Sequence, residues 1–175
     1  MNAQNKQTMP SITEFLRNMG VPAAMIFDID WLKEDGQVAT RYLKGAGIPT
    51  ALRSGFIAQR GAIRSALERA NPNYKREGGV DVLGEAEKCA ANDFFDALEE
   101  YGIFTVRKGE LESWLTTLGV SRNKTGWVTR IFEAMGSEPA SQQYIRPSDN
   151  DVWDFLRHTL DWMSNSARKG MTIAR

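Results

Sequence analysis

An apolar segment that ends in two carboxylates places the strongest constraint on the fold of this chain. Residues 23–30 read Ala-Ala-Met-Ile-Phe-Asp-Ile-Asp, which has the length and composition of a buried strand and closes on Asp28 and Asp30. In an open parallel sheet, ligands gather in the crevice beyond the carboxyl ends of the strands. Two acids there repel each other unless a proton or a cation neutralises them. The segment therefore predicts an α/β fold with a site for Mg²⁺ or Mn²⁺, which prefer such hard oxygen ligands.

Composition narrows the class of protein. A length of 175 residues predicts one domain with a sizeable core. Lys plus Arg equals Asp plus Glu at 22 each, so a DNA partner must be bound by a local patch or through the metal. The single cysteine excludes an internal disulfide and fits a reducing compartment. No apolar run approaches the roughly 20 residues of a membrane span, so we expect a cytoplasmic protein.

The rest of the chain has mainly helical patterns. Apolar spacing and breaker residues predict a second short strand and several helices, over residues 11–19, 37–71 with a break at 45–49, 81–101, 109–118, 125–135 and 149–166. The strand follows the third of these helices, at residues 103–106. Ends at 1–10 and from 168 onward are expected to be flexible around a single domain at 11–167.

The predicted order of elements raises a question about the sheet. A strand, a long helical connection and a second strand predict a right-handed parallel crossover. Two parallel strands leave unpaired edges and are rarely stable alone. We therefore expect further strands, a partner chain or a second copy of this chain to complete the sheet.

A second group of acids follows the second predicted strand. Within Gly-Glu-Leu-Glu-Ser-Trp-Leu, a sharp turn at Gly109 would bring Glu110 and Glu112 into the same crevice, at the start of a helix. Positions two apart on a helix face away from each other, so at most one of the two should reach a metal, and Glu112 is the favoured one. Acids in a first helical turn are also stabilised by the helix dipole without any ligand.

The remaining reactive side chains carry weaker signals. Lys124 precedes a helix and could approach a phosphate as a point charge, although a solvated loop lysine has the same pattern. His158 is the only histidine and lies in an amphipathic segment, so it is interpreted as structural, and histidine-based metal or triad chemistry is not expected. Cys89 is expected to be a buried small residue, and the five tryptophans are expected to be mostly core.

The two acidic motifs together resemble a known family. The stretch from Glu14 through Met-Ile-Phe-Asp-Ile-Asp-Trp-Leu32, followed by Gly-Ile-Phe and Gly-Glu-Leu-Glu-Ser-Trp-Leu115, is similar to the TOPRIM domain of OLD-family (overcoming lysogenization defect) nucleases. The resemblance spans roughly residues 11–136. It implies a Rossmann-like fold, Mg²⁺-dependent cleavage of DNA, and the C-terminal part of an ABC-type ATPase.

The resemblance also assigns roles to residues. It implies that Asp28 and Asp30 are the metal ligands of the family's Asp-x-Asp motif. It implies that Glu112, or else Glu110, is the later acid, and that Lys124 is a basic residue that stabilises the transition state. The family's upstream strand and Glu-Gly motif have no match, because Glu14 lies in a predicted helix. We therefore expect a C-terminal half-domain. It is either the product of a split gene, a piece that needs a partner chain such as an ABC-type ATPase, or a remnant that binds metal poorly and does not cut DNA.

Two other functions fit parts of the sequence. Phe-Asp-Ile-Asp also resembles the nucleophile motif of haloacid-dehalogenase-like phosphatases, in which the first aspartate attacks phosphorus and the second is the acid/base. That motif normally continues with Gly-Thr, whereas Trp31 and Leu32 follow here. The other alternative is a non-enzymatic helical interaction or regulatory protein whose acids are structural.

Overall fold

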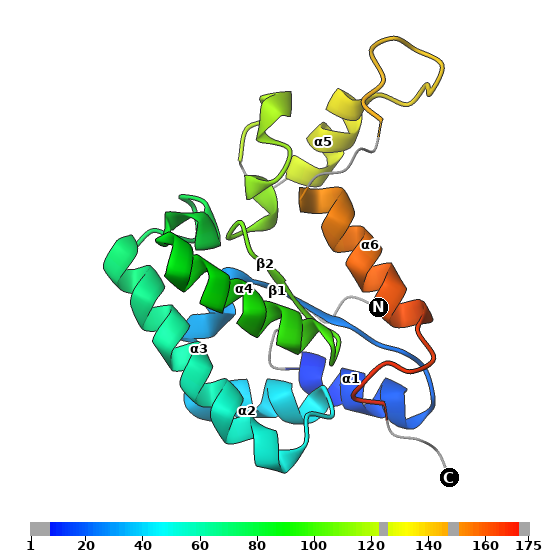
Figure 1. The fold of residues 1–175 in the computed structure, drawn as a ribbon. Coiled ribbons are helices and arrows are strands. Elements are labelled where there is room, and N and C mark those ends of the chain that lie inside the picture. The colour runs from blue at the N-terminus through cyan, green and yellow to red at the C-terminus, as the bar shows by residue number, and fades with distance from the viewer. Residues whose placement is uncertain (1–7, 123–125, 147–150, 172–175) are drawn as a thin grey trace.

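The chain has a mixed α/β fold built on a small parallel sheet, as the sequence predicts. The computed structural model describes residues 8–122, 126–146 and 151–171. At its centre, β1 (Met25–Asp28) pairs in parallel with β2 (Ile103–Val106). The register sets Asp28 opposite Val106, so both strands end at the same edge of the sheet. This edge is where the sequence predicts a site (Figure 1).

Helices and short 3₁₀ turns surround the sheet (Figure 1). In chain order they are α1 (Met9–Asn18), η1 (Ile29–Lys33), α2 (Gly36–Gly45), α3 (Thr50–Ala70), η2 (Gly79–Val82), α4 (Glu85–Glu99), η3 (Leu111–Ser113), η4 (Thr116–Leu118), α5 (Trp127–Met135) and α6 (Asp151–Ser164). Helices α2, α3 and α4 lie together as a group, while α6 packs on the other side of β2. Within the described residues, no helix is both long and apolar enough to cross a bilayer.

Aromatic side chains form the centre of the core. Phe27 on β1 contacts the rings of Trp31 and Tyr42, and Trp31 stacks on Phe94 of α4. The Trp31 Nε1 donates a hydrogen bond of 3.0 Å to the hydroxyl of Thr105 on β2, so this buried indole has a partner. Period-two alternation along β1 turns Met25 and Phe27 inward. The expectation that the tryptophans are mostly core is confirmed, since four of the five are buried: Trp31, Trp114, Trp127 and Trp162.

Arg17 joins five parts of the fold through its guanidinium group. It lies on α1, is only 2% exposed, and donates hydrogen bonds to four backbone carbonyls: those of Ala23, Ala46, Tyr101 and Gly170. The same group lies over the ring of Trp162, 4.8 Å from its centroid. Burial, together with the positive charge of Arg168, lowers the pKa of Arg17 to about 10. The C-terminal segment around Gly170 is thus held against the main body.

The segment after β2 differs from the predicted helix over 109–118. It forms two 3₁₀ turns, η3 and η4, separated by Leu115, whose φ of 53° is left-handed. An L-residue in that region cannot continue a right-handed helix. Trp114, just before this reversal, is buried against Phe155 of α6, with ring centroids 5.0 Å apart. The prediction of a helix was wrong because this tertiary contact outweighs the local pattern.

Burial at several positions does not follow the apolar pattern of the sequence. Cys89 is exposed rather than buried. On α6, Leu160 is 61% exposed, whereas Thr159 and Trp162 are the buried residues. On α1, Phe15 is 63% exposed, although it belongs to the helix's apolar stripe. In both helices, contacts with the sheet select a face that hydrophobic spacing alone does not.

Candidate functional site

The two strand-end carboxylates converge on one lysine. Oδ2 of Asp28 lies 3.0 Å from Nζ of Lys75, and Oδ2 of Asp30 lies 2.7 Å from the same atom. All three side chains are 22–28% exposed. Burial alone would lower the pKa of Lys75, but hydrogen bonds and charges from Asp30 and Asp28 outweigh it and raise the pKa. The pair therefore faces a single cationic position at the end of the sheet.

The backbone brings these acids together in an unexpected way. Asp28 ends β1, but Asp30 lies in the 3₁₀ turn η1 and not in the strand. The prediction that residues 23–30 form one strand was therefore wrong about Asp30. Ile29 between them donates its N–H to the carbonyl of Gly109, 2.9 Å away, which continues the pairing with the chain beyond β2. Convergence thus arises from a strand end followed by a tight turn.

Lys75 is held by the loop between α3 and η2. Tyr74 before it is fully buried, and Lys33 lies over the Tyr74 ring. The backbone at Gly109 lies so close to the Lys75 carbonyl that a Cβ at position 109 would overlap it. Gly109 also has a φ of 112°, which L side chains rarely adopt. Sequence reasoning missed Lys75, since the only signal for it is a lysine within a loop rich in breaker residues.

The later acids are placed apart from this pair. Glu110 is 4% exposed, and its Oε1 lies 3.7 Å from Nη2 of Arg122. Glu112 is part of η3 and is partly exposed. Among the described residues, no group of three or more His, Cys, Asp or Glu side chains could hold a metal ion. Lys124, the predicted phosphate-binding residue, lies outside the described residues.

A polar groove of about 190 Å³ is lined by Arg76, the residue that follows Lys75, and by six others. Its walls carry three cationic side chains, two hydroxyls, one acid and a glycine: Arg76, Lys108, Arg122, Ser113, Thr116, Asp81 and Gly78. Arg122 is oriented by hydrogen bonds to the Ser113 hydroxyl (2.6 Å) and to the Arg76 carbonyl (3.0 Å). Asp81 accepts from both Lys88 and Lys108. Basic and hydroxyl side chains of this kind are the usual partners of phosphate oxygens.

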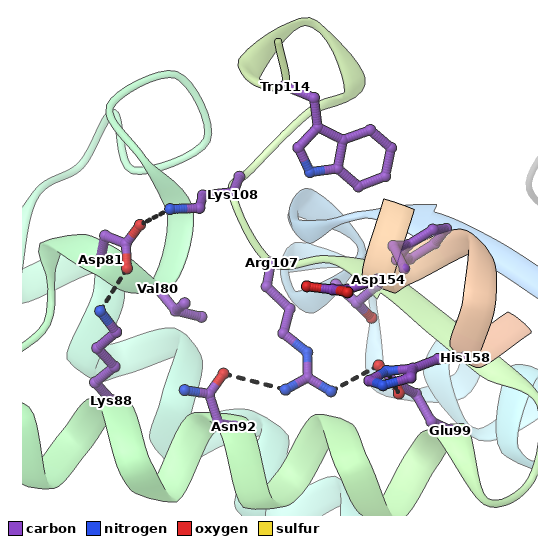
Figure 2. A pocket seen from close by; sticks show the side chains of 12 residues that line it. Val80, Asp81, Lys88, Asn92, Glu99, Arg107, Lys108, Trp114, Asp154 and His158 are labelled. Carbon is purple, nitrogen blue, oxygen red and sulfur yellow. Dashed lines mark hydrogen bonds and ion pairs between the residues drawn. The ribbon is translucent and has the colours of Figure 1, made fainter. Parts of the chain in front are cut away.

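A second cavity, of about 270 Å³, lies between α4, the end of β2 and α6 (Figure 2). Trp114 and Phe155 provide its apolar lining. Arg107, Glu99 and His158 provide polar groups (Figure 2). His158, interpreted from the sequence as structural, is 61% exposed and reaches this cavity from α6.

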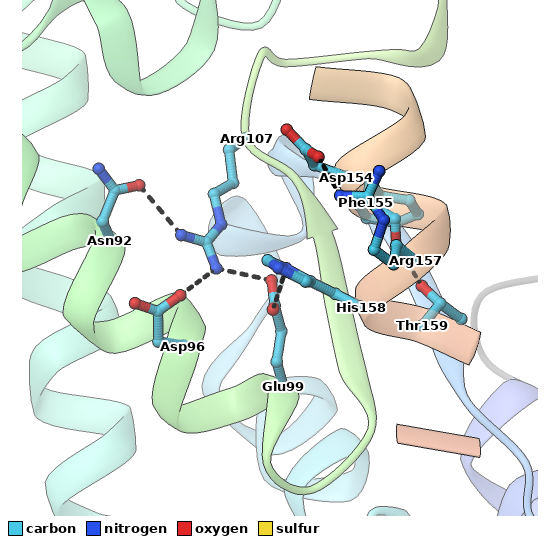
Figure 3. A network of polar contacts seen from close by, with 9 residues as sticks. All are labelled: Asn92, Asp96, Glu99, Arg107, Asp154, Phe155, Arg157, His158 and Thr159. Atoms are coloured by element: carbon cyan, nitrogen blue, oxygen red, sulfur yellow. Dashed lines mark hydrogen bonds and ion pairs between the residues drawn. The ribbon is translucent and has the colours of Figure 1, made fainter. Parts of the chain in front are cut away.

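The polar side of this cavity is an ion network (Figure 3). Nη2 of Arg107 lies 2.5 Å from Asp96 and 2.6 Å from Glu99, while Nη1 donates to Asn92. Burial raises the pKa of Glu99, the charge and hydrogen bond of Arg107 only partly offset this, and the negative charge of Asp96 adds to the rise. The arginine itself has two carboxylate neighbours, which outweigh its burial and raise its pKa. The charge of Arg107 is thus neutralised within the protein, which makes this cavity a poor site for an anion.

The comparisons with known proteins add no family assignment. No protein-family model, curated protein or solved structure matches this chain. The resemblance to TOPRIM domains of OLD-family nucleases therefore stays a prediction from the sequence motifs. Any functional conclusion depends on the chemistry of the strand-end acids and the adjoining groove.

Proposed function

We propose that this chain is a TOPRIM-like module that hydrolyses DNA phosphodiesters with Mg²⁺ or Mn²⁺. The observation that carries the proposal is the convergence of Asp28 and Asp30 on one cationic position, now held by Lys75, at the carboxyl end of a parallel sheet. Each carboxylate has an oxygen within 3.0 Å of that position. An ammonium ion there acts as a stand-in that marks where a metal cation would be attracted.

Two carboxylates are sufficient for the kind of site proposed. Mg²⁺ keeps several waters and is commonly held by one or two carboxylates together with substrate phosphates. Among the described residues, no third His, Cys, Asp or Glu side chain joins the two carboxylates, so we expect weak binding of the metal without DNA and tighter binding with it. When bound, the metal would activate the attacking water and stabilise the leaving oxygen.

The chain's own residues have distinct tasks in this proposal. Asp28 and Asp30 hold the cation. Arg76 and Arg122, on the groove beside Lys75, bind the phosphates that flank the scissile bond. Glu110 is buried beside Arg122 and keeps that guanidinium directed along the groove. The absence of a global positive charge is compatible with this role, because the cations that matter are gathered in one place.

The direct test is metal-dependent nicking of supercoiled plasmid DNA. The wild type should nick with Mg²⁺ or Mn²⁺, and Asp28→Asn combined with Asp30→Asn should lose this activity. Asp161→Asn, which neutralises an exposed acid on α6, is the matched control and should nick like the wild type. Equal nicking by the double variant would attribute the cleavage to a contaminant.

Metal binding can be measured separately from cleavage. A ligand that binds only the folded form at 100 times its Kd stabilises the fold by about 2.7 kcal/mol. For a chain of this length, that corresponds to a rise in Tm of roughly 5–11 °C. We expect such a rise with saturating Mn²⁺ in the wild type and none in the double variant. No rise in either protein would argue against a metal site.

A second function, binding to another protein, is favoured by exposed apolar side chains. Phe15 on α1 and Met19 just after it are each 63% exposed, and Ile26 on β1 is 44% exposed. With only two strands in the sheet, β1 also has an edge that no other described strand pairs. This surface suits a partner chain, such as an ABC-type ATPase, or a second copy that extends the sheet. Light scattering of the wild type and Phe15→Glu would detect self-association and its loss.

A further inference from the structure

Lys75 occupies the position that a metal would need, and this has a consequence for metal binding. We propose that Lys75 is an internal counter-ion that competes with the divalent cation for Asp28 and Asp30, and that metal binds only as the ammonium group leaves. The inference rests on the proposed metal site and adds a positioning residue to it. It explains how two carboxylates stay close together in a protein without metal.

The contacts of Lys75 support a built position and not a chance surface pair. Its Nζ is within 3.0 Å of both carboxylates, and its side chain is only 22% exposed. The loop that carries it is anchored on one side by the buried Tyr74 and on the other by the close approach of Gly109. The backbone of Lys75 therefore cannot move far, whereas its four-carbon side chain can rotate.

Charge decides the competition between the two cations. With the ammonium group in place, Asp28, Asp30 and Lys75 together carry a net charge of about −1. This group attracts a divalent cation far less than two carboxylates without the ammonium would. A metal ion at the same position would repel the ammonium at close range. Arg76, the residue after Lys75, lines the groove, so phosphate oxygens bound there would offer the displaced ammonium group new partners.

The inference is tested by the affinity for Mn²⁺, measured by isothermal titration calorimetry. Lys75→Met removes two partly exposed ion pairs, each of which should weaken the affinity for Mn²⁺ by a modest factor. The variant should therefore bind Mn²⁺ about tenfold more tightly than the wild type. Lys44→Met, which removes an exposed lysine on α2, is the matched control and should bind like the wild type. Tighter binding by Lys75→Met alone supports the competition.

Two other outcomes separate this inference from the proposed function. Equal affinity of the wild type and Lys75→Met overturns the competition but leaves the metal site standing. Failure of the wild type, Lys75→Met and Lys44→Met to bind Mn²⁺ removes the metal site, and the competition with it.

A measurement on the wild type covers the case in which Lys75→Met does not fold. Removal of the ammonium leaves two carboxylates close together without a counter-charge, which destabilises the fold. Reductive methylation followed by mass spectrometry reports how accessible each lysine amine is. Saturating Mg²⁺ should increase the labelling rate of Lys75 severalfold and leave that of Lys44 unchanged. An unchanged rate at Lys75 would overturn the proposal.

Discussion

Replacement of Arg17 should produce a large loss of stability, although this residue lies outside the candidate site. Arg17→Met keeps a long, flexible side chain on α1 but removes every hydrogen bond of the guanidinium group. The carbonyls of Ala46 and Tyr101 accept their bonds from Arg17 in buried surroundings, at 2.7 and 3.0 Å. The carbonyls of Ala23 and Gly170 accept their hydrogen bonds from Arg17 in partly buried surroundings, where water can replace the guanidinium group as donor.

The magnitude follows from the two buried carbonyls. A buried acceptor left without a partner costs about 1–3 kcal/mol, so two of them cost about 2–6 kcal/mol. This range includes the 3–5 kcal/mol typical of a buried charged contact that loses one partner. We therefore expect the free energy of unfolding to fall by about 4 kcal/mol, which corresponds to a decrease in Tm of roughly 8–16 °C. The loss of stability in Arg17→Lys should be smaller than that in Arg17→Met but not zero, because one ammonium group cannot donate to all four carbonyls.

Urea unfolding at 25 °C, followed by far-ultraviolet circular dichroism, measures this loss directly. The midpoint should decrease while the slope m stays unchanged, since the surface exposed on unfolding is nearly the same. Arg69→Met is the control, because it removes an ion pair with Glu87 whose side chains are 67% and 47% exposed. Such pairs contribute about 0–1 kcal/mol. A loss in Arg17→Met no larger than that in Arg69→Met would refute the reasoning.

Two further predictions concern the neighbourhood of the site. Gly109→Ala should destabilise the protein by about 1–3 kcal/mol more than Gly119→Ala, measured by urea unfolding. Both glycines have a positive φ, but only at position 109 would the new Cβ overlap a backbone carbonyl, that of Lys75; equal losses would contradict this explanation. Glu99 has a folded pKa raised by burial above its unfolded value, so its contribution to stability is complete below about pH 4.5 and is lost as the pH rises through the folded pKa. Glu99→Gln lacks this titration, so its free energy of unfolding relative to that of the wild type should be higher at pH 7 than at pH 4.5. Unfolding experiments at the two pH values measure this difference, and the reverse trend would contradict a raised pKa of Glu99.

Much of the secondary structure could be predicted from local pattern. The second strand was predicted at residues 103–106 and lies at Ile103–Val106. The break between α2 and α3, and the helix α5, were also predicted within a few residues. These elements are encoded by runs of similar side chains and by glycine or proline at their ends, which act over a few residues. The acids at the end of β1 were recognised for the same reason.

Other features depend on residues that are distant in the sequence. Lys75 and Asp28 are 47 residues apart in the sequence, and no motif around either residue predicts their contact. Arg17 reaches a carbonyl 153 positions away, and an arginine within a helix would ordinarily be predicted to face water. The outward stripe of α1 has the same origin, since the helix is oriented by Arg17 and not by Phe15.

The sequence by itself determined that this chain has a strand with two acids at and just beyond its end, a second short strand and many amphipathic helices, because those properties follow from the chemistry of neighbouring side chains. The tertiary structure alone decided which cation neutralises the acids, which face of each helix is buried, and where the phosphate-sized groove lies. These outcomes depend on the free energy of contacts between segments far apart along the chain. Hydrophobic periodicity and charge counting describe one segment at a time and do not contain that information.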